Sequence, residues 1–378
     1  MIKIAQGLSI ETLTAPIVGI RHHAHCSGIV AFPDGELLSV FYWAITEANR
    51  KQAIYGVRKM PGEDTWSPPF LVSKDKPNRM EGNPAIWIAP DTGKLWLFYV
   101  SAFGGWSTCT PRFKTSDDRG HTWSKSTKLY WFISRGIKNP PILTSKGWYL
   151  LGAYVEFRDY FTVFFLSKDQ GKIWRELPAR VEVPPEHLPP GFTSEHKGRI
   201  VLQPTLVERA EGSIFCLNRM SRPFGKMGQC ESPDGGLTWT PATAGVLPNP
   251  GGGFHMLRLQ SGNVAVIYNH SPTAETGDAF MRNPVSVALS EDEGRTWAYR
   301  RNLCEYHSDD PSQPDPFARS FGYPTMAQGA DGRIHVTWSF SHPEDRDGQR
   351  LGFTDIQYTS FTEEWIKEQP FFEGPWDL

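Results

Sequence analysis

The fold is decided by four stretches that repeat the pattern S-x-D-x-G-x-x-W: SDDRGHTW (Ser116–Trp123), SKDQGKIW (Ser167–Trp174), SPDGGLTW (Ser232–Trp239) and SEDEGRTW (Ser290–Trp297). Degenerate copies end at Trp66, in GEDTW, and at Trp365, in FTEEW. The closing tryptophans stand at positions 66, 123, 174, 239, 297 and 365, which are 57, 51, 65, 58 and 68 residues apart. Units of this size are typical of the blades of a β-propeller, so the sequence predicts six blades.

The repeated motif has the chemistry of a tight hairpin turn. Its aspartate can accept backbone N–H groups across the turn, its glycine supplies a positive φ, and its tryptophan can pack between neighbouring sheets. We therefore interpret the motif aspartates as structural turn residues and not as catalytic groups: Asp118, Asp169, Asp234 and Asp292.

Paired apolar runs precede the motifs, as in SGIVAFPDGELLSVFYW (Ser27–Trp43), and predict two inner strands joined by a hairpin. The motif would lie on the third strand of each blade and be followed by an outer fourth. The N-terminal stretch LSIETLTAPIVGI (Leu8–Ile20) is expected to supply the outer strand of the last blade and so close the ring. The prediction is an all-β, six-bladed β-propeller that occupies residues 1–378 as a single domain, with long loops at 183–194 and 305–318.

Composition and charge exclude several classes of protein. The formal net charge is −2 and no lysine- or arginine-rich block occurs, so neither nucleic acid nor a membrane is an expected partner. No run approaches the ~20 apolar residues of a membrane span, and the N-terminus lacks a signal-peptide pattern, so we expect a soluble protein of unassigned compartment and oligomeric state. The five scattered cysteines predict buried free thiols and no metal site, and no motif indicates a cofactor.

In a propeller, the ends of the two inner strands of every blade converge around the axis on one face. The residues expected at the strand entries are His22, His23, His25, Arg79, Glu81, Asn83, Lys138, Asn139, Gln203, His255 and Tyr323. Those expected at the strand exits are Glu47, Trp106, Glu156, Arg158, Arg219, Arg222, His270 and His342, with Arg282 before a motif strand. This polar set predicts a ligand site at the axis. Strand alternation sends His22 away from His23 and His25, which disfavours a metal site there.

The motifs and the phrases around them resemble the sialidase (neuraminidase) superfamily, whose repeat is called the Asp-box or BNR repeat, over essentially the whole chain. In that family three arginines hold the substrate carboxylate, a tyrosine assisted by a glutamate is the nucleophile, and an aspartate is the acid/base. FGYPTMAQGADGRIHVTW is similar to the tyrosine segment and implies the nucleophile position for Tyr323. CLNRMSR and MRNPVSVALSEDEGRTW are similar to two arginine segments and imply Arg219, with Arg222 as its alternate, and Arg282.

Two positions depart from the pattern of the family. AHCSGIVAFPDG places His25 where the family has its first arginine, and LQPTLVERAEG places Gln203 where the family has the glutamate that assists the tyrosine. Both changes remove a group on which sialidase chemistry depends. The resemblance therefore implies a site with an altered reaction.

The preferred hypothesis is an enzyme that cleaves a terminal glycosidic linkage in an acidic, uronate-containing oligosaccharide or polysaccharide by β-elimination. Arg219 and Arg282 would neutralise the carboxylate, His25 would accept the proton on the adjacent carbon, and Tyr323 would protonate the leaving oxygen. The phrases RHHAHCSGIV, EGNP, GGWST, NPPI and YNHSP also resemble predicted neuraminidases close to propeller lyases that act on rhamnose–glucuronate linkages. Gln203 completes the expected catalytic set, and the further substrate contacts expected are Arg79, Glu81, Asn83, Trp106, His255, Glu47 and Arg222.

Three alternatives stay open. A retaining sialidase-type exo-hydrolase would keep Tyr323 as nucleophile and use Glu47, Glu81 or Glu156 in place of the lost groups. A hydrolase with a carboxylate pair could act on a neutral or rhamnose-capped sugar. A noncatalytic sugar-binding propeller would use aromatic faces such as those of Trp43 and Trp106.

Overall fold

The computed structural model describes residues 2–14, 23–157, 160–188, 201–220, 224–271, 282–306, 320–346 and 349–368, without the side chains of 343–353. His22, Arg158 and Arg222 lie outside these residues, as do parts of the two expected long loops. The described chain is almost entirely β-structure, and its short helical elements are η1 (Trp106–Thr108), η2 (Pro185–His187) and α2 (Glu363–Lys367). Within this described part, no helix has the length and apolar character needed to cross a membrane.

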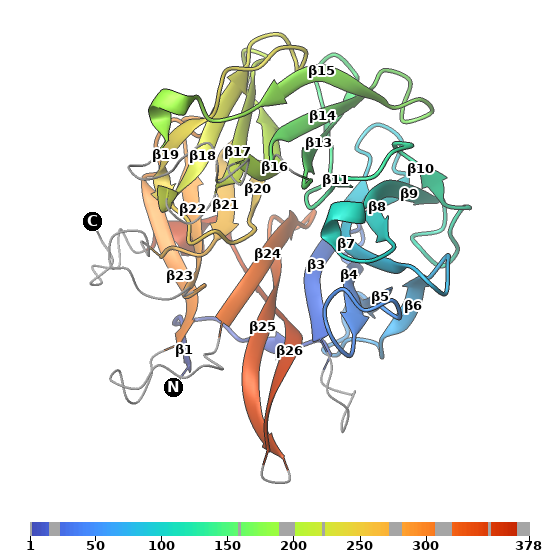
Figure 1. The fold of residues 1–378 in the computed structure, drawn as a ribbon. Helices are drawn as coiled ribbons and strands as arrows, with labels where there is room; N and C mark the ends of the chain where they lie inside the picture. The colour runs from blue at the N-terminus through green and yellow to red at the C-terminus, as the bar shows by residue number, and fades with distance from the viewer. Residues whose placement is uncertain are drawn as a thin grey trace.

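Four sheets have the antiparallel strand order of a single propeller blade (Figure 1). The first contains β7 (Met80–Ile88), β8 (Leu95–Ala102), β9 (Thr110–Ser116) and β10 (Thr127–Lys128). The second contains β11 (Arg135–Gly136), β12 (Ile142–Leu143), β13 (Tyr149–Val155), β14 (Thr162–Ser167) and β15 (Arg175–Val181). The third contains β16 (Val201–Glu208), β17 (Ile214–Met220), β18 (Lys226–Ser232) and β19 (Thr243–Pro248). The fourth contains β20 (His255–Arg258), β21 (Val264–Tyr268), β22 (Val285–Ser290), β23 (Tyr299–Tyr306) and β1 (Ile2–Ile4).

The remaining strands share one eight-stranded sheet. It contains β24 (Ser320–Gln328), β25 (Ile334–Arg346), β26 (Gln349–Phe361), β2 (Glu11–Thr12), β3 (His23–Ala31), β4 (Leu37–Ala44), β5 (Ala53–Lys59) and β6 (Phe70–Ser73). A single parallel pair, Thr354 with His23, links its two antiparallel halves. The expected all-β propeller arrangement is confirmed, but six separate blades are not observed, because four sheets stand alone and the other strands are joined.

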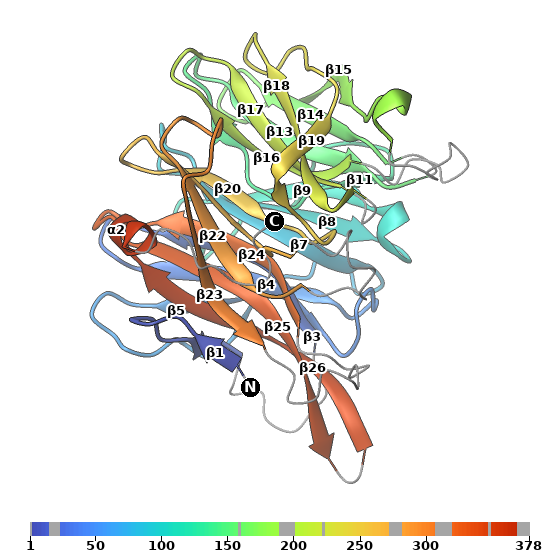
Figure 2. The ribbon, with the colours of Figure 1, turned by 90° about the vertical axis from the view of Figure 1, so that its left-hand side faces the viewer.

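The N-terminal segment contributes short strands to two different sheets. Strand β2 pairs with β26, where Glu11 faces Tyr358, and β1 pairs with β23, where Lys3 faces Glu305. The N-terminal strand expected in the last blade is thus only two residues long. The hairpin of β25 and β26 is much longer, at 13 residues a strand, and projects beyond the ring of sheets (Figures 1 and 2).

The four motif turns are built as the sequence predicts. In each turn the serine hydroxyl accepts the N–H of the glycine, and the aspartate accepts the N–H of the residue four positions after it, at 2.7 to 2.9 Å in every case. The glycines have φ between 81° and 103°, and a Cβ at Gly171 would lie 2.3 Å from Trp96. Only glycine meets both demands. The structural interpretation of the motif aspartates is confirmed.

The degenerate copy that ends at Trp365 is a different structure. Here Thr362 caps helix α2, and its side chain accepts the N–H of Trp365. The tryptophan nevertheless lies in the hydrophobic core. The guanidinium of Arg301 stacks on its ring, with Cζ 3.7 Å from the ring centroid. The FTEEW segment thus keeps the packing role of the motif without its turn.

Aromatic side chains of the motifs pack each sheet against the preceding one. Trp239 stacks on Phe164 with ring centroids 3.9 Å apart, and Trp174 meets Phe98 edge-on at 5.6 Å. Such aromatic pairs add to the stabilisation that comes from buried area. The innermost strands accordingly contact their neighbours around the axis, β24 with β3, β3 with β7, β12 with β16, β16 with β20, and β20 with β24.

Candidate functional site

Four innermost strands share a β-bulge at the same point along their length. The bulges place Cys26, Asn83, Gln203 and Tyr323 at φ between 48° and 55°, and the strand register shifts at each of them. Residues other than glycine rarely adopt this left-handed conformation, and bulges redirect side chains near functional sites. The repeated bulge therefore marks the level of the axis at which a site is built.

Tyr323, Gln203 and Arg219 form a closed hydrogen-bonded triangle. The phenolic oxygen of Tyr323 accepts hydrogen bonds from Nη1 of Arg219 at 2.9 Å and from Nε2 of Gln203 at 3.3 Å. Nη1 of Arg219 also donates to Oε1 of Gln203 at 3.2 Å. Because both lone pairs of the phenolic oxygen accept hydrogen bonds, its own proton is directed elsewhere.

His25 packs against the same tyrosine. Its ring meets that of Tyr323 edge-on, with centroids 4.6 Å apart, and it also contacts His23 and Tyr42. Burial holds the pKa of His25 well below its usual value of 6.5, and His23, Arg282, Lys138 and Arg219 lower it further. His25 is therefore a neutral imidazole at neutral pH, with one ring nitrogen available as a base.

A second guanidinium lies beside the tyrosine ring. The Cζ atom of Arg282 is 5.2 Å from the ring centroid of Tyr323, and that of Arg219 is 5.9 Å from it. All three side chains are half-buried, whereas His25 and Gln203 are buried. Two guanidinium groups close together suit a carboxylate, which each can bind through two parallel hydrogen bonds. We call His25, Gln203, Arg219, Arg282 and Tyr323 the axial cluster.

Two carboxylates lie near the axial cluster. Glu47 is exposed, and its Oε1 accepts a hydrogen bond from the hydroxyl of Tyr42 at 3.3 Å. Glu156 is half-buried, and burial raises its pKa, Arg219 opposes that rise, and Glu47 adds to it. Glu47 and Arg219 thus both affect the pKa of Glu156. Because this pKa is raised overall, Glu156 is a candidate acid.

Other predicted residues lie away from the axial cluster. Glu81 is fully buried, and its carboxylate accepts hydrogen bonds from the hydroxyl of Ser73 at 2.6 Å and the N–H of Asp75 at 2.7 Å. These partners belong to β6 and the loop after it, so the carboxylate of Glu81 is held away from the axial cluster. Arg79 stacks at 6.0 Å from the ring of Phe103.

Asn83 and Trp106 border the axial cluster without joining it. Nδ2 of Asn83 donates to the hydroxyl of Tyr154 at 3.2 Å. Trp106 is half-buried, and its ring lies 6.0 Å from that of Tyr42. Tyr154 has a further link to the cluster, since burial raises its pKa well above the usual value while a hydrogen bond with Gln203 lowers it.

His255 lies further along the axis and is buried. Its Nδ1 accepts the N–H of Met326 at 3.3 Å, and burial together with Lys138 lowers its pKa to about 3. It lines a cavity of about 550 Å³ formed by the continuation of the innermost strands beyond the bulges. No residue of the axial cluster lines that cavity, so the structure places His255 apart from the cluster.

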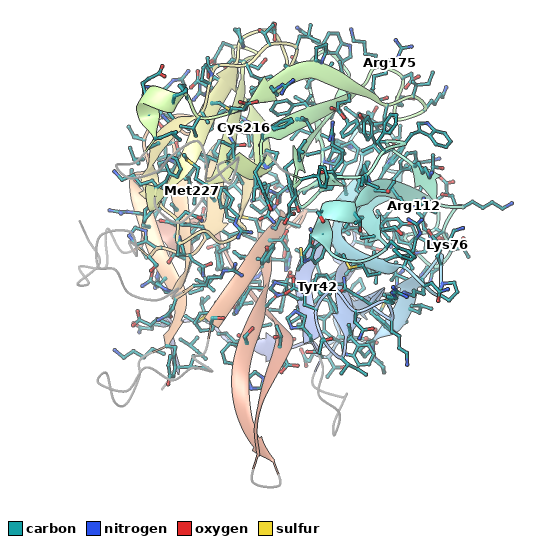
Figure 3. The ribbon with its side chains drawn as sticks, viewed as in Figure 1. Tyr42, Lys76, Arg112, Arg175, Cys216 and Met227 are labelled. Atoms are coloured by element: carbon teal, nitrogen blue, oxygen red, sulfur yellow. The ribbon has the colours of Figure 1, made fainter. Side chains whose placement is uncertain are left out.

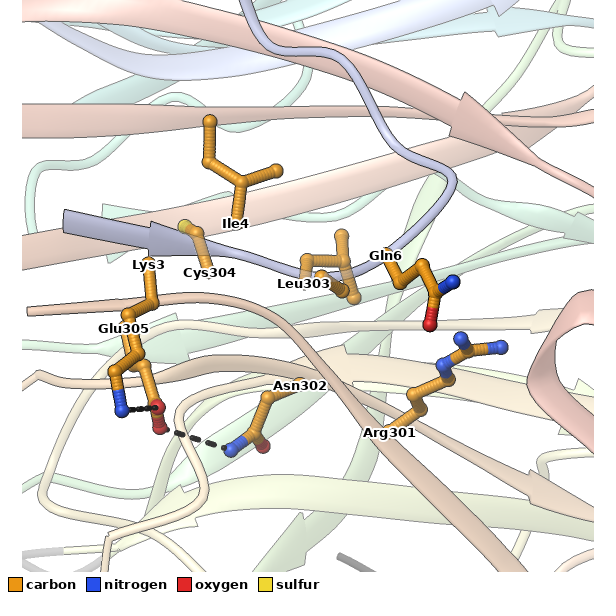
Figure 4. A pocket seen from close by; sticks show the side chains of 9 residues that line it. Lys3, Ile4, Gln6, Arg301, Asn302, Leu303, Cys304 and Glu305 are labelled. Atoms are coloured by element: carbon orange, nitrogen blue, oxygen red, sulfur yellow. Dashed lines mark hydrogen bonds and ion pairs between the residues drawn. The ribbon is translucent and has the colours of Figure 1, made fainter. Parts of the chain in front are cut away.

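The other histidines predicted at strand exits form local pairs. Nδ1 of His270 lies 2.6 Å from the hydroxyl of Tyr268, and Nε2 of His342 lies 2.7 Å from a carboxylate oxygen of Asp355. A smaller pocket, of about 180 Å³, lies between β1 and β23 and is lined by residues 3–6 and 301–305 (Figure 4). It contains none of the predicted site residues. In the described ranges, no three histidine, cysteine, aspartate or glutamate side chains are grouped to hold a metal ion.

Sequence reasoning missed Tyr42 and the glycines before β20. Tyr42 lies near the centre of the ring of sheets, whereas Arg112 and Arg175 lie toward its outside (Figure 3). A Cβ at Gly253 would lie 2.9 Å from the Tyr323 ring and 3.0 Å from Oε1 of Gln203. The run GGG before an inner strand was a usable signal, because it marks a close approach of backbone to a neighbour.

Solved structures share this fold. A protein of unknown function from Dyadobacter fermentans has a TM-score of 0.69 at 16% identity, with 95% of this chain and 98% of that one covered. The Hadza microbial sialidase Hz136 has a TM-score of 0.67 at 16% identity, with coverages of 91% and 66%. The intramolecular trans-sialidase from Ruminococcus gnavus has a TM-score of 0.65 at 12% identity, with coverages of 92% and 96%. Identities this low show a common fold alone.

No curated protein matches the chain. The family model described as a BNR repeat-like domain matches residues 35–336, which contain all four complete motif turns and the whole axial cluster except His25. This match confirms the expected BNR repeat, and the sialidase structures share the fold of the chain. The chain belongs to the BNR repeat-like domain family.

Proposed function

We propose that this protein is a carbohydrate-active enzyme that cleaves the terminal linkage of an acidic saccharide by β-elimination at the axial cluster. The observation that carries the proposal is the contact of a neutral His25 with a Tyr323 whose phenolic oxygen accepts two hydrogen bonds. We also propose that the chain is one domain of six blades, two of them supplied by the eight-stranded sheet.

The arginines would bind the substrate. A uronate carboxylate placed between Arg219 and Arg282 would be neutralised, which acidifies the hydrogen on the neighbouring carbon. The single negative charge of the sugar would thus be recognised and used in the reaction.

His25 and Tyr323 would transfer the protons. The C–H bond next to the carboxylate breaks as its proton passes to His25, a C=C bond forms, and the C–O bond to the leaving sugar breaks as that oxygen takes the proton of Tyr323. With ring centroids 4.6 Å apart, the two groups suit a proton and a leaving oxygen on the same face of the sugar ring. Exchange with solvent restores both residues.

A sialidase-type retaining hydrolase is the second candidate. It is favoured by Glu156, because burial raises the pKa of this carboxyl group and the charge of Arg219 lowers it. It is also favoured by the hydrogen bond that Arg219 donates to Tyr323, which would stabilise a phenolate nucleophile. Against it stands Gln203, because an amide cannot take the proton from the tyrosine.

The test is incubation of the purified protein with oligosaccharides whose terminal sugar is linked to O4 of a glucuronate and, separately, with sialyllactose. The proposal predicts an unsaturated uronate, detected by its ultraviolet absorbance, that is absent with Tyr323→Phe. Release of free sialic acid from sialyllactose would contradict the elimination and support the retaining hydrolase. Measurable binding of either saccharide without turnover would identify a sugar-binding propeller.

A further inference from the structure

Lys138 is a buried cation beneath the axial cluster. It lies between β11 and β12, is 3% exposed, and donates from Nζ to the carbonyl of Pro324 at 3.1 Å, the carbonyl of Phe254 at 3.3 Å and Oδ1 of Asn139 at 3.1 Å. An ammonium group has three N–H donors. All three are used within the protein, so Lys138 has none left to offer a ligand.

Asn139 extends the same set of contacts to a further strand. It is 2% exposed, and its Nδ2 donates to the carbonyl of Pro204 at 2.9 Å and approaches that of Gln203 at 3.4 Å. Two adjacent side chains from one segment thus bind backbone carbonyls of β16, β24 and the residue before β20.

Each of these carbonyls adjoins a residue of the axial cluster or one that touches it. Pro324 follows Tyr323, Pro204 follows Gln203, and Phe254 follows Gly253, whose backbone packs against the ring of Tyr323. Tyr323 and Gln203 both have the left-handed backbone of a bulge. Such a conformation persists only when the surroundings hold it in place, and Lys138 and Asn139 bind the backbone directly after it.

The charge of Lys138 is expensive to bury. In the described part of the chain no carboxylate forms an ion pair with it, and burial lowers its pKa to about 8. Burying a cation that only neutral oxygens contact is unfavourable relative to burying an apolar residue of similar size. A structural link between three strands does not by itself require a positive charge.

The charge of Lys138 affects both axial histidines. It lowers the pKa of His255, for which burial alone is a larger cause, and it lowers the pKa of His25 less than burial, His23 and Arg282 do. The titratable and charged groups that act on His25 or contact its ring are His23 on β3, Tyr42 on β4, Tyr323 on β24, Lys138, Arg219 and Arg282.

We infer that Lys138 and Asn139 are positioning residues for the axial cluster: Asn139 fixes the strand that carries Gln203, and Lys138 fixes the strand that carries Tyr323. The catalytic part of this inference rests on the proposed function. The placement of the strands and the protonation of His25 can be measured without any substrate.

The experiment compares Lys138→Met with two other variants. Lys114→Met is the matched control. Lys114 is also buried, but it lies on β9, away from the cluster, and its Nζ forms an ion pair with Oδ1 of Asp75 at 2.6 Å. Asn139→Ala removes the neutral links alone and keeps the charge. The protonation of His25 is followed by NMR of ¹³C-labelled histidine, assigned with His25→Asn, and the position of Tyr323 is taken from crystal structures.

Lys138→Met should raise the titration midpoint of His25 toward 6.5, whereas Lys114→Met should not. Asn139→Ala should leave the midpoint unchanged but lengthen the bond between Tyr323 and Arg219. On a saccharide that the wild type cleaves, both cluster variants should lose about tenfold or more in kcat, and only Lys138→Met should move the acid limb of the pH profile upward.

An unchanged His25 titration in Lys138→Met would overturn the role of the charge. An unchanged Tyr323–Arg219 distance in both cluster variants would overturn the positioning. If Lys138→Met does not fold, Lys138→Gln, which keeps hydrogen-bond donors without the charge, takes its place in the same titration. Lack of turnover by the wild type counts against the proposed function alone, because the titration and the distances still decide the inference.

Discussion

Nη1 of Arg219 donates a hydrogen bond to the phenolic oxygen of Tyr323 across 2.9 Å, although 104 residues separate them in the chain. In a site with a carboxylate base next to the tyrosine, that oxygen would donate its proton to the base. Here Gln203 donates to it as well, which leaves the phenol as the acid of the cluster. The direction of the hydrogen bond between Gln203 and Tyr323 thus distinguishes elimination from nucleophilic attack. One substitution at Gln203 can reverse that direction.

Gln203→Glu should exchange one chemistry for the other. A carboxylate at this position would accept the tyrosine proton and remove the acid from the proposed elimination, so formation of unsaturated product should fall by about tenfold or more. Initial rates of ultraviolet absorbance against the wild type measure the loss, with Gln203→Met as a control of similar length. A faster elimination in Gln203→Glu would mean that Tyr323 is not the acid.

His25→Asn should abolish turnover with little change in KM. The imidazole is proposed to take the proton and not to hold the carboxylate, and loss of a general base costs about 10²–10⁴-fold in kcat. In the wild type the lowered pKa of His25 places the acid limb of kcat/KM below pH 6.5, because activity is lost only when the folded-state imidazole is protonated. An acid limb at or above that pH would show that another group is the base.

Acid should unfold the protein through His255. Its pKa is about 3 in the folded protein against 6.5 in the unfolded chain, so the unfolded state binds more protons between those values and the free energy of unfolding falls as pH drops through this window. The full loss is about 5 kcal/mol. His255→Asn, which keeps an acceptor for the N–H of Met326, should flatten this slope in urea titrations. The exposed His121→Asn serves as control and should leave it unchanged.

Asp292→Ala should destabilise the fold without affecting the reaction. Oδ1 accepts the N–H of Thr296 at 2.7 Å and Oδ2 accepts its hydroxyl at 2.6 Å, and the loss of bonds to a charged acceptor in one turn costs about 2 kcal/mol. Glu291→Ala, which removes only an exposed ion pair with Lys367, should cost less than about 1 kcal/mol. Equal losses in denaturant unfolding would contradict the structural role of the motif aspartate.

The sequence allowed the motif turns and the members of the axial cluster to be predicted for one physical reason. Each turn fixes the end of a strand, and the ends of the two inner strands of every blade meet around the axis. Arg219, Gln203 and Tyr323 were therefore expected to converge once the repeat was recognised. The parallel pair of Thr354 with His23 has no such signal. It joins two antiparallel halves into one sheet, so the number of separate sheets is smaller than the number of blades expected from the repeat.

The positions of Glu81 and Asn83 could not be predicted from the sequence, for a different physical reason. A polar side chain at a strand end can be satisfied by the neighbouring sheet, as Glu81 on β7 is by Ser73 on β6. The bulge at Asn83 also shifts the alternation from which the direction of its side chain would be judged. The contacts of Lys138 require carbonyl groups of Phe254 and Pro324, far away in sequence, and carbonyl groups carry no residue identity. Only a three-dimensional structure reveals such partners.

The reaction itself is decided most directly by cleavage, in ¹⁸O-labelled water, of an oligosaccharide whose terminal sugar is linked to O4 of a glucuronate, with the products weighed by mass spectrometry. Elimination at the axial cluster predicts an unsaturated uronate that is lighter by one water than the saturated uronate, and a released terminal sugar without the label. A saturated uronate together with a released terminal sugar that carries the label would contradict the account.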